Sequence, residues 1–278
     1  MKIDAHQHYW KLARGDYGWL TPEKGPIYRD FMPADLAPYL AKHGIDRTIL
    51  VQAAPTEAET KFLLQIAFET QSVAGVVGWL DFEAPDVPER IRALAGKHDR
   101  LVGLRPMLHD IVDPEWLLKH VSLEARIAMY MEGIALDALV RPRHLSVLAA
   151  FMSRNGPGPT VVIDHCAKPE LRDPGGAHKR WQADMAARAA RGAWCKLSGL
   201  VTEAPADWTV ASLESTVRFV LEVFGPEKII WGSDWPVVDL GGGYDRWHAV
   251  ARELAGIHPR IFGENAHECY LSKRGRNW

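Results

Sequence analysis

The sequence of 278 residues lacks the features that mark several large classes of protein. It has only three cysteines, at positions 166, 195 and 269, and their odd number and wide spacing exclude both a disulfide framework and a CxxC zinc motif. Its longest uninterrupted apolar run, Val73 to Leu80, has eight residues, whereas a membrane-spanning helix needs about 20. We therefore expect neither a structural zinc knuckle nor a membrane partner.

An excess of charge of one sign is also missing. The 33 basic and 35 acidic side chains leave a net charge of −2, so no basic surplus is available for phosphate backbones and we expect no nucleic-acid partner. No apolar export segment follows the initial Met-Lys-Ile-Asp, which predicts a cytoplasmic protein. Neither a GxGxxG nor a GxxxxGK phosphate loop occurs. What is present is an ordinary globular composition, with 47% hydrophobic residues and eleven tryptophans, several of them beside polar motifs.

Eight short runs rich in β-branched residues alternate with amphipathic stretches. The expected strands are Lys2–His6, Thr48–Gln52, Val73–Leu80, Leu101–Arg105, Gly133–Asp137, Thr160–His165, Ala193–Ser198 and Lys228–Asp234. Successive strands begin about 30 residues apart, which is the length that a βα unit needs. This spacing favours a single (β/α)8 TIM barrel over residues 1–278. A doubly wound open sheet is the alternative. Such a sheet has a glycine-rich phosphate loop after its first strand, whereas this chain has His-Gln-His there.

One connection is unusually long. Residues 9–32, after the first expected strand, are rich in tryptophan, tyrosine, glycine and proline. A connector of this length and aromatic content is more typical of an ordered pocket wall than of a linker. We therefore expect one domain with a lid-like first loop, and no linker divides the chain.

Polar side chains cluster at the expected carboxyl ends of strands, where barrel enzymes place their active sites. His6 and His8 lie two positions apart, a spacing that places both imidazoles on one face of a strand. Strand alternation places His165 on the same face as Val161 and Ile163 and turns Asp164 to the other face, and Asp234 ends the eighth strand. Each residue alone is compatible with a structural histidine or a helix N-cap. Their conjunction on three strands predicts a site.

Further polar and aromatic residues are expected near this site. Arg105 and Lys196 stand at the ends of the fourth and seventh strands, either as substrate donors or as members of ion pairs inside the barrel. Gln52, at the end of the second strand, is a candidate hydrogen-bonding group, and Trp10 and Trp19 are candidate aromatic platforms for a ring of the substrate.

The sequences of these motifs resemble those of the amidohydrolase superfamily, and within it those of the sugar lactonases. The segments that carry the resemblance are DAHQHYW, YGWL, VQAAPTEAET, GVVGWLDF, GLRPM, VVIDHCAKP, CKLSGL and WGSDWPV, spread from Lys2 to about Leu271. The resemblance implies a distorted amidohydrolase-type barrel and a hydrolase that opens a sugar (aldono)lactone, such as an L-fucono- or L-rhamnono-lactone, to its acid. It implies that Asp234 is the general base, that His6, His8 and His165 surround the carbonyl oxygen, and that Arg105 and Lys196 reach the substrate.

Two rival functions remain open from the sequence. Relatives with the same barrel use a similar set of histidines and aspartate for metal-dependent non-oxidative decarboxylation, which would release carbon dioxide. A barrel that only binds a ligand would have no need for a base. The sequence does not indicate the oligomeric state.

The resemblance also bears on the metal content. Binuclear members of the superfamily bridge two metals with a residue after strand four and add a histidine after strand five, whereas this chain has Arg105 and Asp137 there. A single divalent ion, Zn²⁺ by the chemistry of three nitrogens and one carboxylate, fits His6, His8, His165 and Asp234. Because related lactonases hydrolyse without a metal, and because protonated histidines could polarise a carbonyl themselves, we expect zinc to bind without being indispensable.

Overall fold

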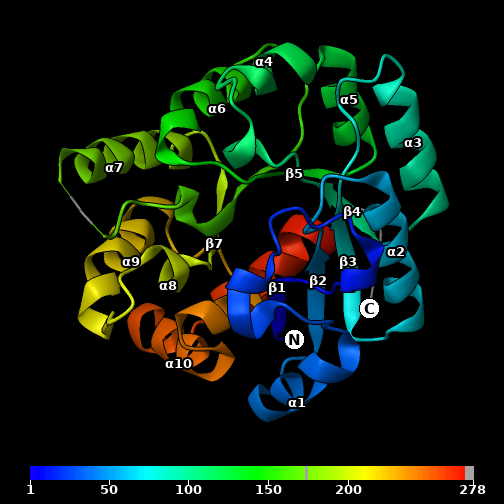
Figure 1. The fold of residues 1–278 in the computed structure, drawn as a ribbon. Coiled ribbons are helices and arrows are strands. Elements are labelled where there is room, and N and C mark those ends of the chain that lie inside the picture. Colours follow the sequence, from blue (N-terminus) through cyan, green and yellow to red (C-terminus); the bar gives the residue numbers. More distant parts are fainter. Residues whose placement is uncertain (173–174, 273–278) are drawn as a thin grey trace.

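A computed structural model, which describes residues 1–172 and 175–272, contains one parallel sheet of eight strands that follow each other in sequence order (Figure 1). The strands are β1 Ile3–Gln7, β2 Arg47–Val51, β3 Val73–Gly78, β4 Leu101–Leu104, β5 Ala135–Ala138, β6 Val161–Ile163, β7 Trp194–Leu197 and β8 Ile229–Trp231. The sheet closes where Asp234 N donates to His6 O at 2.8 Å and His8 N donates to Trp235 O at 2.7 Å. The expected (β/α)8 barrel is confirmed, and the open doubly wound sheet is excluded.

Helices follow the strands and cover the outside of the barrel (Figure 1). They are α1 Pro33–His43, α2 Glu57–Glu69, α3 Val87–Lys97, α4 Trp116–His120, α5 Leu123–Met131, α6 Leu145–Met152, α7 Gly176–Ala189, α8 Leu200–Glu203, α9 Val210–Phe224 and α10 Tyr244–Ala255. Local signals set their ends: the Thr56 hydroxyl caps α2 by accepting from Glu59 N at 3.0 Å, and α1 ends at Gly44 in the left-handed conformation. None of the helices in the described part of the chain is long and apolar enough to cross a membrane.

Short helical turns complete the chain. They are η1 Leu12–Arg14, η2 Pro22–Ile27, η3 Leu108–Asp110, η4 Pro142–His144, η5 Asp164–Ala167, η6 Val237–Gly241, η7 Arg260–Glu264 and η8 His267–Leu271. The last of these brings the chain back into the barrel, where Figure 1 shows it in red among the strands. Cys269, Tyr270 and Leu271 join Ile3, Ala5 and other inward-facing strand residues in one buried cluster. The C-terminal segment therefore fills the inner core.

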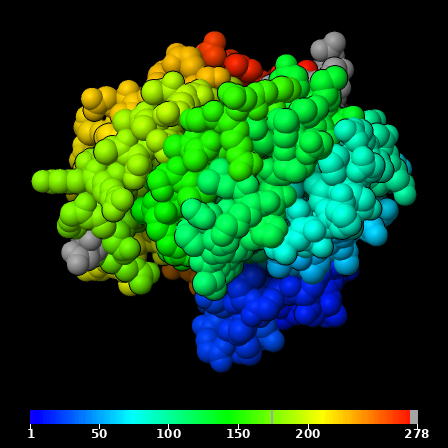
Figure 2. Space-filling model, turned by 90° about the horizontal axis from the view of Figure 1, so that it is seen from above, coloured from blue at the N-terminus to red at the C-terminus, as the bar shows by residue number. Residues whose placement is uncertain are grey.

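The first loop, residues 9–32, is ordered and pinned to the barrel. Its two ends meet as an antiparallel bridge in which Trp10 and Phe31 exchange two backbone hydrogen bonds of 3.0 Å. Its middle is tied to the start of α2, because Thr56 Oγ1 donates to Asp16 Oδ2 at 2.8 Å. In the space-filling view the blue N-terminal part of the chain lies along one edge of the face formed by the green helices (Figure 2).

Several strands are shorter than expected, and the reason is local backbone conformation. β6 ends at Ile163 rather than His165, since His165, Cys166, Ala167 and Lys168 have φ between 51° and 60° and form a left-handed turn. β8 ends at Trp231, and Asp234 also has a positive φ of 61°. The expected C-terminal boundary at residue 278 lies outside the described residues.

Candidate active site

Four side chains meet above the carboxyl end of the barrel. His6 and His8 come from β1 and the residue after it, His165 from η5, and Asp234 from the segment after β8. Asp234 Oδ1 lies 3.4 Å from His8 Nε2, 3.6 Å from His6 Nε2 and 3.9 Å from His165 Nε2. All four residues are at most 4% exposed. The structure thus brings together the residues that the sequence analysis proposed, around one carboxylate oxygen.

Two of the histidine rings are oriented by hydrogen bonds at their far nitrogens. His8 Nδ1 lies 2.8 Å from the Val51 carbonyl oxygen, which can only accept, so in the neutral ring Nδ1 carries the proton and Nε2 keeps its lone pair. His165 Nδ1 lies 2.9 Å from Ser198 Oγ. In both rings Nε2 is left facing Asp234, an arrangement typical of histidines prepared to bind a ligand or metal.

Two glycines allow the histidines to sit where they do. A Cβ on Gly232 would lie 2.5 Å from the Cβ of His6, so β8 can approach β1 this closely only without a side chain. A Cβ on Gly199, whose φ is +63°, would lie 2.5 Å from Nδ1 of His165. The ring of His165 therefore occupies the space that any other residue at position 199 would fill.

Strand alternation mispredicted the sixth strand. Val162 belongs to the inner cluster while Val161 and Ile163 belong to the outer one, so simple alternation would turn His165 away from the barrel axis. The left-handed turn brings His165 back into the site and leaves Asp164 inside as well. Asp164, which is fully buried and lies 3.5 Å from His6 Nδ1, is the main residue that the sequence analysis left out of the site. The signal for it was the pair of cations, Arg105 and Lys196, that a barrel interior has to neutralise.

Arg105 and Lys196 are both joined to Asp164. Arg105 Nη1 lies 3.1 Å from Asp164 Oδ2, and Lys196 Nζ lies 3.0 Å from Asp164 Oδ1. Lys196 also binds Asp137 and lies 3.2 Å from His6 Nδ1, and it is fully buried. Gln52, also fully buried, donates from Nε2 to the backbone carbonyl of Arg105 at 2.8 Å. The backbone carbonyl of Gln52 accepts in turn from Arg105 Nη2. The structure therefore places these three residues in an ion-pair network beneath the histidines, where Arg105 alone reaches the cavity wall.

The open space beside Asp234 is a cavity of about 320 Å³, which is a size typical of small-molecule sites. Its wall includes His8, Trp19, Arg105, His165 and Asp234, and further residues that the sequence analysis did not single out. These are Lys24, Ala53, Met107, His109, Asp110, Leu139, Lys168, Thr202, Glu203, Val237 and Leu240.

The two candidate tryptophans differ in position. Trp19 lines the cavity and is held by a 2.7 Å hydrogen bond from its indole nitrogen to Ala53 O. Trp10 is fully buried behind His8, with its ring stacked 6.3 Å from that imidazole and its nitrogen donating to Arg29 O at 2.8 Å. Trp10 therefore supports His8 in this structure, and Trp19 is the aromatic residue in the cavity wall.

Burial decides the charge state of the cluster. Burial lowers the pKa of His6 and that of His165 well below the usual 6.5, so both rings are neutral near pH 7. Burial also acts to raise the pKa of the Asp234 carboxyl, but the neighbouring histidines, His165 first, outweigh it and keep this pKa below its ordinary value. Asp234 is therefore an anion with its proton-accepting oxygen toward the histidines, and protonated His6 and His165 are disfavoured as carbonyl-polarising groups.

The donor set fits a single metal ion. Ligand atoms of His6, His8 and Asp234 lie within 4.8 Å of one another, and ligands placed tetrahedrally at about 2.0 to 2.1 Å from zinc are about 3.4 Å apart. His8 Nε2 and Asp234 Oδ1 lie 3.4 Å apart, which is about the separation expected for two ligands of one such ion. His6, His8 and Asp234 are thus able to hold one ion, and His165 falls in a neighbouring group with His6 and Asp164.

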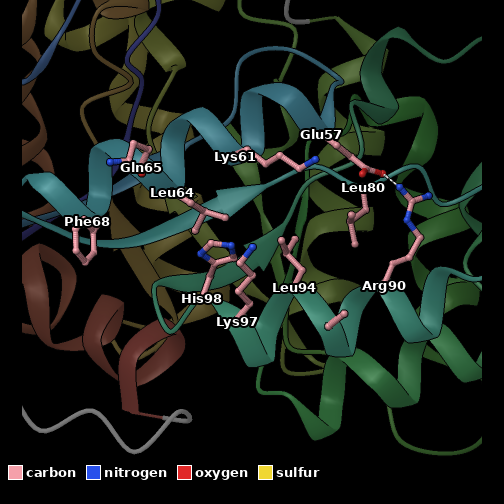
Figure 3. A pocket seen from close by; sticks show the side chains of 11 residues that line it. Glu57, Lys61, Leu64, Gln65, Phe68, Leu80, Arg90, Leu94, Lys97 and His98 are labelled. Carbon is pink, nitrogen blue, oxygen red and sulfur yellow. Dashed lines mark hydrogen bonds and ion pairs between the residues drawn. The ribbon is translucent and has the colours of Figure 1, made fainter.

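A larger hollow lies elsewhere. It has a volume of about 680 Å³ and runs between α2 and α3, with Leu64, Phe68 and Leu94 along it and the Glu57–Arg90 ion pair at one end (Figure 3). It lies on the outer helices and contains none of the four clustered residues. The smaller cavity beside Asp234 is therefore the candidate active site.

Comparison with known proteins supports the fold and identifies the family. Residues 3–271 match the family model described as Amidohydrolase. The chain is 42% identical to a protein of Burkholderia ambifaria named L-fucono-1,5-lactonase, over 98% of this chain and 96% of that one. It is 34% identical to a protein of Burkholderia multivorans with the same name, over 97% and 96% of the two chains. A crystal structure of an amidohydrolase from Burkholderia multivorans with bound zinc superposes with a TM-score of 0.89 and 32% identity, covering 97% of this chain and 99% of that one.

Proposed function

Because this chain belongs to the amidohydrolase family, we propose that it is a lactonase that hydrolyses L-fucono-1,5-lactone and related aldonolactones to their sugar acids. The observation that carries this proposal is the convergence of three histidine nitrogens on one oxygen of the anionic Asp234, at the wall of a sugar-sized cavity. Two relatives that match nearly the whole chain bear the lactonase name, and none of the observations favours decarboxylation.

Asp234 acts as the general base. A lactone is a cyclic ester, so its opening needs a nucleophilic water, a stabilised acyl oxygen and a proton for the departing ring oxygen. The carboxylate of Asp234 takes the proton from the water and then returns it to the leaving alkoxide, whose high pKa makes that transfer necessary. The buried position of Asp234 limits competing hydration and strengthens these interactions.

The neighbouring side chains position the reacting groups. The rings of His8 and His165, fixed by hydrogen bonds at Nδ1, point Nε2 toward Asp234, where these nitrogens position the attacking water beside the base or hold a metal. Arg105 borders the cavity and presents its guanidinium edge to the ring oxygens, whereas Lys196 and Gln52 act through Arg105 and His6 by holding them in place. Trp19 provides an apolar surface for one face of the sugar ring.

The metal proposed for this site is zinc, held by the group His6, His8 and Asp234, with His165, whose Nε2 lies 3.9 Å from Asp234 Oδ1, as the fourth ligand. When bound, it supplies Lewis-acid polarisation of the acyl oxygen. Since a lactone carbonyl is already electrophilic, we expect exhaustive chelation to reduce turnover only in part, with zinc content assayed in parallel by plasma mass spectrometry. Complete loss that stoichiometric zinc restores would show that the metal is indispensable and would contradict this expectation.

The test of function is a pH-indicator assay over a panel of aldonolactones. L-Fucono-1,5-lactone should be hydrolysed well above the rate of its spontaneous opening, and Asp234→Asn should remove the difference. Carbon dioxide is measured in the same samples with aromatic acids as substrates. Release of carbon dioxide without turnover of any aldonolactone would overturn the proposal in favour of the decarboxylase.

A further inference from the structure

A second polar cavity lies at the opposite end of the barrel from Asp234. It has a volume of about 340 Å³ and is bordered by Thr160, Trp194 and Lys228, which stand at the starts of β6, β7 and β8. The clustered histidines follow the carboxyl ends of the strands, so the barrel separates the two cavities. Helices α5 and α6, the loop 153–160 and the turn after α7 at Arg191 and Gly192 form the remaining wall.

The wall of this cavity carries charge of one sign only. Arg126, Arg154, Arg191 and Lys228 line it, and no aspartate or glutamate does. Among the residues that the structure describes, none of these four cations forms an ion pair with a carboxylate. This distinguishes the cavity from the barrel interior, where Arg105 and Lys196 are neutralised by Asp164.

The arginines in the wall are positioned by hydrogen bonds to neutral oxygen atoms. Arg126 is only 4% exposed and donates to the carbonyl oxygens of Asn155 at 3.3 Å and Arg154 at 3.2 Å. Its Nε atom is buried without a partner. Arg154 donates to Leu118 O at 2.5 Å and Val121 O at 3.3 Å, and Arg191 donates from Nε to Ser153 Oγ at 3.1 Å.

A buried guanidinium without a countercharge is costly, since buried charges in proteins are paired or bind ions. Burial, together with the neighbouring charge of Arg154, lowers the pKa of Arg126, which agrees with a positive charge that the protein itself leaves uncompensated. Lys228 Nζ lies 3.8 Å over the ring of Trp194, which also borders the cavity, so its contact is with an aromatic ring and not with a carboxylate.

We propose that this cavity, bordered by Arg126, Arg154, Arg191 and Lys228, is a binding site for a small multiply charged anion of the phosphate class. Guanidinium groups match the oxygens of a phosphate in fork-like pairs, and several cations around one cavity favour a ligand with more than one negative charge. The site is independent of lactone hydrolysis, because none of its residues contacts the Asp234 cavity. Inorganic polyphosphates and phosphorylated metabolites share this chemistry.

The test is isothermal titration calorimetry of the whole protein at an ionic strength held constant with sodium chloride. The probes are pyrophosphate, inorganic phosphate and fructose 1,6-bisphosphate. The double variant Arg191→Gln/Lys228→Gln removes two accessible cations, and the matched control Arg92→Gln/Lys61→Gln removes the same charges from α3 and α2. Lactone turnover reports that each variant is folded.

We expect saturable binding of one pyrophosphate per chain, weakened at least tenfold by Arg191→Gln/Lys228→Gln and changed less than twofold in the control. Tighter binding of fructose 1,6-bisphosphate than of pyrophosphate identifies an organic phosphate as the ligand source, and the reverse identifies an inorganic one. Absence of saturable binding by all three probes overturns the proposal, as does equal weakening in the two double variants.

Discussion

At the scale of single residues, the carboxylate of Asp234 is the group on which the chemistry depends. It is the only acid among the four clustered residues, and its pKa below the ordinary value keeps it ready to accept a proton at neutral pH. We expect Asp234→Asn to keep the fold and to lower kcat by about a hundredfold or more, the usual size for a lost general base. Steady-state kinetics on L-fucono-1,5-lactone with a circular dichroism check provide the measurement. Activity within a few-fold of the parent would remove Asp234 from this role.

A second carboxylate, Glu59, controls stability rather than catalysis. Its oxygens accept hydrogen bonds from Ala53 N and Ala54 N at 2.7 to 3.0 Å, beside the Trp19 side of the cavity. Burial raises the pKa of the Glu59 carboxyl from 4.5 to about 7. The Glu59 carboxyl of the folded chain therefore binds a proton more tightly than that of the unfolded chain. The stability gained from this protonation is fully present below pH 4.5 and is lost as the pH rises through 7.

Glu59→Gln should remove this dependence. Between pH 5 and pH 8 the parent should lose up to about 3 kcal/mol more of its unfolding free energy than the variant, since one pKa unit corresponds to about 1.4 kcal/mol. Urea unfolding at the two pH values measures the difference. Glu69→Gln, on the exposed part of the same helix, is the control and should follow the parent. Parallel curves for Glu59→Gln and the parent would contradict the prediction.

The residues of the site could be predicted from the sequence to the extent that they end strands. His6, His8, His165 and Asp234 were proposed in this way, because parallel strands deliver their carboxyl ends to one rim, and the structure brings the four side chains together. The network below them could not be found, since a pattern of period two does not reveal which cation inside a barrel is neutralised by which carboxylate. Asp164 is the clearest case, for the alternation argument turned it away from His165.

At the scale of elements, the left-handed turn at His165–Lys168 is the feature that shapes the site. Four consecutive non-glycine residues with positive φ cost about 1 to 2 kcal/mol each, so the surroundings must hold the turn. Trp181 Nε1 donates to Cys166 O at 2.8 Å, and Lys168 Nζ pairs with Glu203 at 2.6 Å. The sequence could not predict this turn, because alanine and lysine at these positions carry no signal for left-handed backbone.

The glycine opposite this turn provides a test. Gly199→Ala places a methyl group on the ring of His165 at a φ of +63°, so the imidazole has to move. We expect kcat to fall tenfold or more and the unfolding free energy to fall by about 1 to 3 kcal/mol. Kinetics and urea unfolding are the measurements.

Gly96→Ala is the control for this substitution. Gly96 lies in α3 with open space around its missing side chain, so alanine should raise the unfolding free energy by about 0.5 to 1 kcal/mol and leave kcat unchanged. If Gly199→Ala behaved like Gly96→Ala, the close approach to His165 would have no catalytic consequence.

At the scale of the whole molecule, the site is connected to the C-terminal segment through buried charges. Tyr270, in η8, donates to both oxygens of Asp137 at 2.9 Å, Asp137 binds Lys196, and Lys196 binds Asp164 beneath the histidines. The phenol therefore hydrogen-bonds to a fully buried carboxylate.

We expect Tyr270→Phe to lower the unfolding free energy by about 1.5 to 3 kcal/mol, the range for a hydrogen bond to a buried charge. Tyr130→Phe, at an exposed position on α5, should change it by less than about 0.5 kcal/mol. Urea unfolding of the two variants side by side is the measurement. Equal stability of both would mean that Asp137 does not need this donor.

The filling of the barrel by residues 266–271 has a consequence for the order of events during biosynthesis. A ribosome releases β1 to β8 before it releases η8, so a nascent chain has all eight strands while the space inside them is still empty of Cys269, Tyr270 and Leu271. The inner faces of β3 and β4, which η8 contacts, cannot be covered at that stage. Assembly of the barrel interior, and of the charge network that supports His6, therefore waits until η8 has been synthesised rather than proceeding strand by strand.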